Sequence, residues 1–157
     1  MVDKKKEYRF FSVVTMVVIV LDQLMKWLTL KINPQWDWSF LKIHMVTNTG
    51  AGFGILQDKT LLLAMFSFLV AVVIVWNYRK IPAERFTQFC VALFLGGVLG
   101  NFIDRAFRGH VIDFIDFKFW PAFNVADMAI SIAVVGLIWY SWRMGREKKL
   151  DKRKSNI

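Results

Sequence analysis

The sequence predicts an all-α polytopic membrane protein of four transmembrane helices, with a small β-sheet and a short amphipathic segment at the outer interface. Hydrophobic residues make up 56% of the 157 residues, above the roughly 45–50% of a soluble domain. They gather in long runs, with basic residues clustered between the runs. We expect a single membrane domain over residues 1–157, because this length suits one domain and the 16% aromatic content excludes a disordered chain.

Cysteine and histidine are too few for two other classes of protein. With Cys90 alone the chain cannot form an internal disulfide, and with only His44 and His110 it lacks the Cys/His cluster of a zinc site. We therefore expect neither a metal ion nor another cofactor.

Four apolar runs approach the roughly 20 residues that a bilayer-spanning helix needs. They cover residues 10–30, 60–78, 86–103 and 125–142. The basic residues before the first run imitate a secretory signal, but no A-x-A-like cleavage site follows, so we expect a retained first helix.

Basic residues predict the orientation of the spans. The N-terminal flank, the loop between the second and third spans, and the tail over residues 143–157 together hold 14 of the 21 Lys and Arg. Cytoplasmic flanks carry the excess of these residues. Both termini should therefore be cytoplasmic, and the basic tail suits this topology and anionic lipid better than nucleic acid.

The two outer connections contain the residues of the predicted sheet and interfacial segment. Trp36, Trp38 and Phe40 alternate with polar residues, and the alternation then reverses phase through Met45. This pattern predicts one strand that carries a one-residue bulge. The second connection, residues 111–120, is rich in aromatic residues, which suit the level of the lipid headgroups.

Polar residues gather at one predicted depth of the membrane, near the outer ends of the spans. A charge inside a bilayer costs at least about 2.5 kcal/mol on insertion scales, so a group of them indicates a functional site. The group comprises Asp22, Lys26, Asn48, Asn101, Asp104, Arg105, Asp113, Asn124 and Asp127.

Structural roles remain open for several of these residues. Asp22 and Lys26 are four residues apart on one helix face and can neutralise each other. Asp104 beside Arg105 can form a charge-balanced helix end. Asn124 and Asp127 have the spacing of a capping box, and the glycines within residues 96–100 favour close helix packing.

Two carboxylates suit the chemistry that remains. The histidines have no plausible serine or cysteine partner, and the metal ligands are missing. Two close acids can activate a water and protonate a leaving amine. Asp113 and Asp127 are the best-placed pair. A small transporter or proton channel with intramembrane acids, and a non-catalytic membrane assembly factor, are the alternatives.

Five motifs, in order along the chain, resemble those of the lipoprotein signal peptidase (signal peptidase II) family. They are Asp22-Gln-x-x-Lys26, Asn48-Thr-Gly-Ala-Gly-Phe-Gly54, Gly96-Gly-x-x-Gly-Asn-x-x-Asp-Arg105, Val111-Ile-Asp-Phe114 and Phe123-Asn-x-Ala-Asp127. The resemblance implies an aspartic endopeptidase of the bacterial cytoplasmic (inner) membrane, with its active site near the outer face. It would cleave diacylglyceryl-modified prolipoproteins just before the lipidated cysteine.

The resemblance also implies roles for individual residues. Asp113 and Asp127 correspond to the catalytic pair. Asp22, Lys26 and Asp104 are expected to be structural because of their local spacing, described above. The positions expected to bind substrate or support the pair are Asn48, Gly50, Asn101, Arg105, Asn124 and Ala126. The implied partners are prolipoprotein substrates, membrane lipids and cyclic peptide inhibitors of the globomycin type, with no nucleic acid.

The distribution of basic residues makes the topology testable. In a Cys90→Ala background, an impermeant thiol reagent added outside intact cells should label Asn33→Cys and Lys59→Cys and should leave Pro82→Cys unlabelled. The opposite labelling pattern would invert the orientation and would separate the polar group from the outer face.

Overall fold

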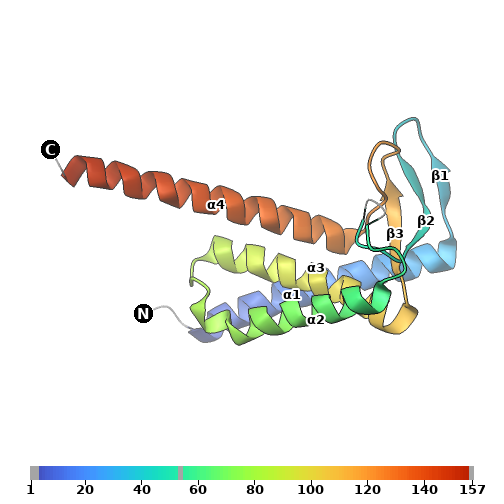
Figure 1. Ribbon diagram of the computed structural model, residues 1–157, viewed down its shortest axis with the longest axis horizontal. Helices are drawn as coiled ribbons and strands as arrows, with labels where there is room; N and C mark the ends of the chain where they lie inside the picture. The colour runs from blue at the N-terminus through green and yellow to red at the C-terminus, as the bar shows by residue number, and fades with distance from the viewer. Residues whose placement is uncertain (1–3, 53–54, 156–157) are drawn as a thin grey trace.

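A computed structural model describes residues 4–52 and 55–155 of the chain, with side chains for residues 6–52 and 55–147. Its helices are α1 (Lys4–Ile32), α2 (Thr60–Trp76), the 3-10 helix η1 (Tyr78–Lys80), α3 (Arg85–Arg108) and α4 (Val125–Ser155). Its strands are β1 (Gln35–Asp37), β2 (Lys42–Asn48) and β3 (Val111–Asp116). The strands form a small sheet at one end of the helices (Figure 1).

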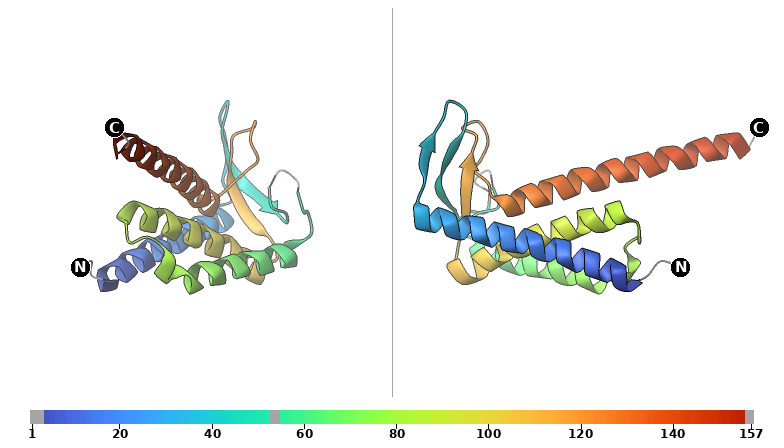
Figure 2. Two further views of the ribbon diagram at one scale, coloured as in Figure 1. Left: turned by 60° about the vertical axis from the view of Figure 1, so that its left-hand side comes forward. Right: turned by 180° about the vertical axis from the view of Figure 1, so that it is seen from behind.

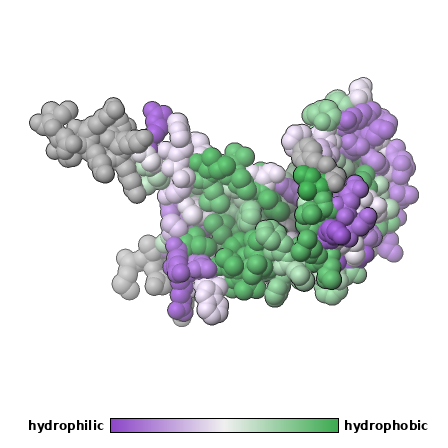
Figure 3. Space-filling view, in the orientation of Figure 1, coloured by the Kyte–Doolittle hydropathy of each residue, from purple (hydrophilic) through white to green (hydrophobic). Residues whose placement is uncertain are grey.

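The helices match the four predicted spans with shifted ends. Segments of α1, α3 and α4 are long and apolar enough to cross a membrane, whereas α2 is a shorter apolar helix of 17 residues. Helix α3 continues five residues beyond the predicted 103, and α4 continues through the basic tail to Ser155. On the face drawn in Figure 3, apolar residues cover the middle of the helices and hydrophilic residues lie towards both ends.

Helix α3 lies at the centre of the bundle and packs against α1, α2 and α4 (Figure 2). Glycines allow the close approach. A methyl group at Gly96 would lie 2.7 Å from Val18 Cβ of α1, and one at Gly97 would overlap the Ala126 carbonyl of α4. The glycine segment therefore packs helices together, as the sequence indicated.

The sheet is antiparallel in the order β1-β2-β3. The prediction of one bulged strand over residues 36–45 is wrong. The alternation of apolar and polar side chains changes phase because the chain turns back on itself. Trp38 N donates to Leu41 O at 2.8 Å, which closes a hairpin between β1 and β2. A register irregularity exists, but it lies between Ile43 and Val46, where β2 pairs with β3.

The sheet ends of α1 and α3 enclose a cluster of buried charges. Lys26 is fully buried, and its Nζ lies 2.8 Å from Asp22 Oδ2 and 2.9 Å from Asp104 Oδ2. Arg108 forms a further ion pair with Asp104. The predicted pair of Asp22 and Lys26 is confirmed, and Asp104 pairs with Lys26 and Arg108 rather than with its neighbour Arg105.

This cluster also connects the other elements. Asp104 Oδ2 accepts a hydrogen bond from the Ile112 backbone N–H of β3 at 3.1 Å. Asp22 Oδ1 accepts one from the Ala126 N–H of α4 at 2.9 Å. Two buried acids on α1 and α3 thereby fix the start of the strand and the start of the last helix.

Removal of the central cation should be strongly destabilising. Lys26→Met leaves two buried carboxylates short of a partner, and such a break costs about 3–5 kcal/mol. Thermal unfolding in detergent should show a large loss of stability. The double variant Lys26→Met/Asp22→Asn should regain part of that stability. Lys118→Met, which breaks an exposed pair with Asp37, should change stability by no more than about 1 kcal/mol. Equal losses in the two lysine variants would contradict this assignment.

Candidate active site

The two predicted catalytic acids come from different elements that meet at the sheet end of the bundle. Asp113 lies in the middle of β3, and its side chain is 1% exposed. Asp127 lies in the first turn of α4 and is partly exposed. The buried charge cluster positions both acids through the residue that precedes each of them. The N–H of Ile112, before Asp113, donates to Asp104, and the N–H of Ala126, before Asp127, donates to Asp22.

Asn124 contacts both acids. Its Nδ2 donates to Asp113 Oδ1 at 2.6 Å, and its Oδ1 accepts from the Asp127 backbone N–H at 3.0 Å. Its own N–H donates to Asp127 Oδ2 at 3.2 Å, which completes the predicted capping box. The structural and functional interpretations of this motif are therefore compatible, because the cap that starts α4 also orients the two carboxyl groups.

Asn101 connects the buried charge cluster to Asp127. Its Oδ1 accepts from Lys26 Nζ at 3.0 Å and from Asn124 Nδ2 at 3.2 Å. Its Nδ2 must then face the other way, and it donates to Asp127 Oδ1 at 2.7 Å. The lysine thus determines the orientation of an amide that holds one of the two acids.

Asn48, Gly50 and Arg105 form the side of the site towards α2. Asn48 Nδ2 donates to Asp113 Oδ2 at 2.9 Å, and its Oδ1 accepts from Gly50 N–H at 2.9 Å. Arg105 Nη2 donates to Gly50 O at 3.1 Å. The loop carries this motif from β2 towards α2, and the motif's last two residues, Phe53 and Gly54, lie outside the described residues.

The environment of Asp113 favours its protonated form. Burial, and then the charge of nearby Asp127, raise the pKa of the Asp113 carboxyl from 3.8 to about 6, against the hydrogen bonds from Asn48 and Asn124. A group with this pKa can hold or release a proton close to neutral pH.

An apolar pocket of about 370 Å³ lies beside Asp127. Its other lining residues are Trp120, Phe123, Met128, Ser131 and Ile132. Asp127 therefore faces a space that can take an apolar side chain, whereas Asp113 is enclosed. Among the described residues, no group of three or more His, Cys, Asp or Glu could hold a metal ion.

The structure brings together all the residues singled out in the sequence. It also adds Arg108, and it gives a role to Gln23, which the sequence analysis named only as part of the first motif. Gln23 Nε2 donates to Asp104 Oδ1 and to Gly100 O, each at 3.1 Å, and Arg108 Nη1 donates to Gln23 Oε1 at 2.9 Å. The spacing of Arg108, four residues after Asp104 on one helix face, was the signal that could have identified it. Ala126 contributes its backbone N–H and a side chain small enough to pack against Gly100.

Solved structures share the overall fold of this chain. One, described as a bacterial membrane enzyme at 2.3 Å resolution, aligns with a TM-score of 0.82 and 28% identity over 88% of this chain and 90% of its own. A second, at 1.9 Å resolution, aligns with a TM-score of 0.73 and 29% identity over 83% of this chain and 90% of its own.

Sequence comparison identifies the family. The family described as Signal peptidase (SPase) II matches residues 14–143. The lipoprotein signal peptidase of Moorella thermoacetica is 40% identical over 82% of this chain and 90% of its own length. That of Caldanaerobacter subterraneus subsp. tengcongensis is 41% identical over 84% of this chain and 93% of its own. With matches over most of its length and a site built from the motifs described above, this chain belongs to the signal peptidase II family.

Proposed function

We propose that this protein is an aspartic endopeptidase that removes the signal peptide from diacylglyceryl-modified prolipoproteins, cutting just before the lipidated cysteine. Membership of the signal peptidase II family supports the cleavage of signal peptides from prolipoproteins. The observation that carries the aspartic mechanism is the position of Asn124, which bonds both Asp113 and Asp127 beside an apolar pocket. The site would face the outer side of the bacterial cytoplasmic membrane, with both termini inside.

The two acids would have different roles. Asp127 accepts hydrogen bonds at both oxygens, and it lies in the first turn of a helix, where the helix dipole favours an anion. It would take a proton from the water that attacks the scissile carbonyl. Asp113, which holds its proton to about pH 6, would polarise that carbonyl and then protonate the leaving amine as the C–N bond breaks. A proton transfer between the acids would restore the starting state.

Two apolar pockets would hold the lipid and the peptide. The pocket beside Asp127 lies against α4. A second, of about 520 Å³, lies between α2 and α3, where Leu61, Phe68 and Phe102 line it and Arg105 borders it. Both pockets border residues of the polar cluster, so a substrate with acyl chains and a peptide backbone could occupy both while its scissile bond lies at the acids.

The distribution of buried charge favours a peptidase over a transporter. Among the described residues, the fully buried charged side chains are Asp22, Lys26, Asp104 and Asp113, all in or next to the cluster that contacts β3. A transport pathway would also need ionisable groups part-way along the bundle, between this cluster and the opposite end.

Replacement of either acid should abolish cleavage of a lipidated precursor peptide. Asp113→Asn and Asp127→Asn keep the side-chain size but remove the titrating group, so each should lower kcat by at least about 10³-fold. The double variant should be little worse, because residues that act as a unit are non-additive. Asp37→Asn, an exposed acid of β1, is the matched control and should cleave at the parent rate.

Asp104 separates this assignment from its nearest rival. Asp104→Asn should lower thermal stability, because Lys26 loses one of its two acidic partners and Arg108 loses its ion pair. The folded fraction should retain turnover. A well-folded Asp113→Asn enzyme with near-parent activity, together with an inactive but folded Asp104→Asn enzyme, would transfer the catalytic role to Asp104.

The pH dependence should follow the proton on Asp113. Because Asp113 must be protonated, kcat/KM should fall as pH rises through about 6, the pKa of its carboxyl, and should also fall in acid as Asp127 takes up a proton. Asn48→Ala removes a hydrogen bond that stabilises the Asp113 anion, so it should move the alkaline limb to higher pH. A shift to lower pH would contradict the assigned roles.

Chelators and cyclic peptide inhibitors test the proposed aspartic mechanism without any mutation. A divalent-metal chelator should leave cleavage of the precursor peptide unchanged, since the proposed mechanism uses two carboxyl groups. A globomycin-type cyclic peptide should inhibit it competitively. Loss of activity with the chelator, restored by adding a divalent ion, would contradict an aspartic mechanism.

A further inference from the structure

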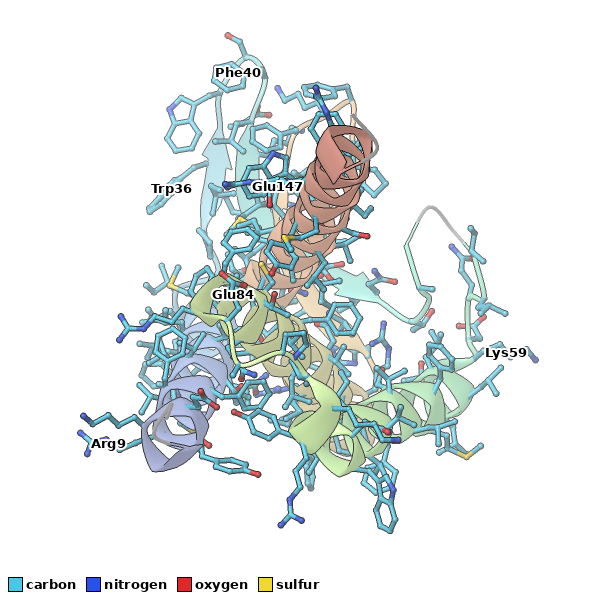
Figure 4. The ribbon with its side chains drawn as sticks, turned by 90° about the vertical axis from the view of Figure 1, so that its left-hand side faces the viewer. Arg9, Trp36, Phe40, Lys59, Glu84 and Glu147 are labelled. Carbon is cyan, nitrogen blue, oxygen red and sulfur yellow. The ribbon has the colours of Figure 1, made fainter. Side chains whose placement is uncertain are left out.

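The opposite end of the bundle contains a cavity that the peptidase mechanism does not use. It has a volume of about 470 Å³ and is lined by Glu7, Tyr8, Tyr78, Arg79, Ile81, Ala83 and Gln88. These residues come from α1, η1, the connection that follows η1, and the first turn of α3. Figure 4 looks onto this end, with Arg9 of α1 and Glu84, just before α3, labelled.

Glu7 is the unusual residue in this cavity. Its Oε1 is buried, and no described residue donates a hydrogen bond to it. An unsatisfied buried acceptor costs about 1–3 kcal/mol, and more when it is charged. A carboxylate that only complemented the dipole of the first helical turn would not need this burial. Glu7 therefore requires a donor from outside the described chain.

Two other polar side chains of the cavity, Tyr78 and Gln88, are already paired. Tyr78 Oη donates to Gln88 Oε1 at 2.9 Å, and Gln88 Nε2 donates to Pro82 O at 2.9 Å. The Tyr8 and Tyr78 rings lie 4.6 Å apart. The wall is thus a fixed aromatic and amide surface, with one unsatisfied anion on α1 and the cation of Arg79 on η1.

The position of the cavity indicates the class of ligand. The membrane-crossing segments begin at Lys6 in α1 and at Arg85 in α3, and α2 ends at Trp76. The cavity therefore lies at the level of the lipid headgroups, where tyrosine rings are favoured. A ligand there needs an N–H donor for Glu7 and an anionic group for Arg79.

We propose that this cavity binds a phospholipid headgroup that carries a primary amine next to its phosphate. The ammonium donates to Glu7 Oε1 beside the tyrosine rings, and the phosphate faces Arg79. A quaternary amine has the same charge but no N–H, so it leaves Glu7 unsatisfied. This site is independent of the proposed peptidase mechanism, since it shares no residue with it.

The test compares two lipids that differ only at the amine. The full-length protein is placed in nanodiscs that contain equal amounts of phosphatidylethanolamine and phosphatidylcholine with identical acyl chains. It is then released from the nanodiscs, and the lipids that stay bound are identified by native mass spectrometry. The protein should retain phosphatidylethanolamine preferentially. Glu7→Gln should reduce this preference about tenfold, as expected for the loss of one charge-assisted hydrogen bond. Arg79→Gln should weaken retention of both lipids.

Controls distinguish a specific site from a general effect on the protein. Glu147→Gln changes an acid of α4 that pairs with Arg143 outside the cavity, and it should keep the parent preference. Glu7→Gln, Arg79→Gln and Glu147→Gln should all cleave precursor peptide at the parent rate. Ala83→Phe fills the cavity without changing its charge and should also reduce retention. Equal retention of the two lipids by the parent protein, or an unchanged preference in Glu7→Gln and Ala83→Phe, would contradict the proposed headgroup site.

Discussion

The sheet end of this protein depends on one fully buried ammonium group. Lys26 Nζ lies within 3.0 Å of oxygens from Asp22, Asp104 and Asn101. The two acids in turn accept the backbone N–H groups at which β3 begins and α4 enters the bundle. The lysine and the two acids are fully buried inside the protein, so water cannot replace their partners, and the cluster is stable only when all of them are present. A large part of the fold around the site therefore follows from this set of contacts.

The same cluster organises the chemistry, because asparagines connect it to the acids. Asn101 accepts from Lys26 and donates to Asp127, and Asn124 bonds both Asp127 and Asp113. An asparagine has a donor end and an acceptor end, so the fixed position of the ammonium determines the direction of every amide in the series. Lys26 is thus a positioning residue in our account, although it would not contact the substrate.

The sequence predicted the helices and the composition of the site well, because both depend on residue type and spacing. Apolar runs identified the four helices, and the i,i+4 spacing identified the pair of Asp22 and Lys26. The hairpin of β1 and β2 was mistaken for one bulged strand, because a chain reversal and a bulge both invert the alternation of side chains. The partners of Asp104 were also missed, since Lys26 is distant in sequence and becomes a neighbour only when α1 packs against α3. Local spacing identifies pairs within an element, whereas packing decides pairs between elements.

Titration of the individual carboxyl groups tests the central claim most directly. The full-length protein, labelled with carbon-13 at the aspartate carboxyls and assigned through the Asp113→Asn and Asp127→Asn variants, can be followed by nuclear magnetic resonance from acid to neutral pH. Our account predicts that Asp113 titrates near pH 6, far above the ordinary 3.8, and that its midpoint moves down when Asp127 is replaced. An Asp113 resonance that titrates at the ordinary value in the folded protein, unaffected by Asp127→Asn, would contradict the assignment of these two acids as a catalytic pair.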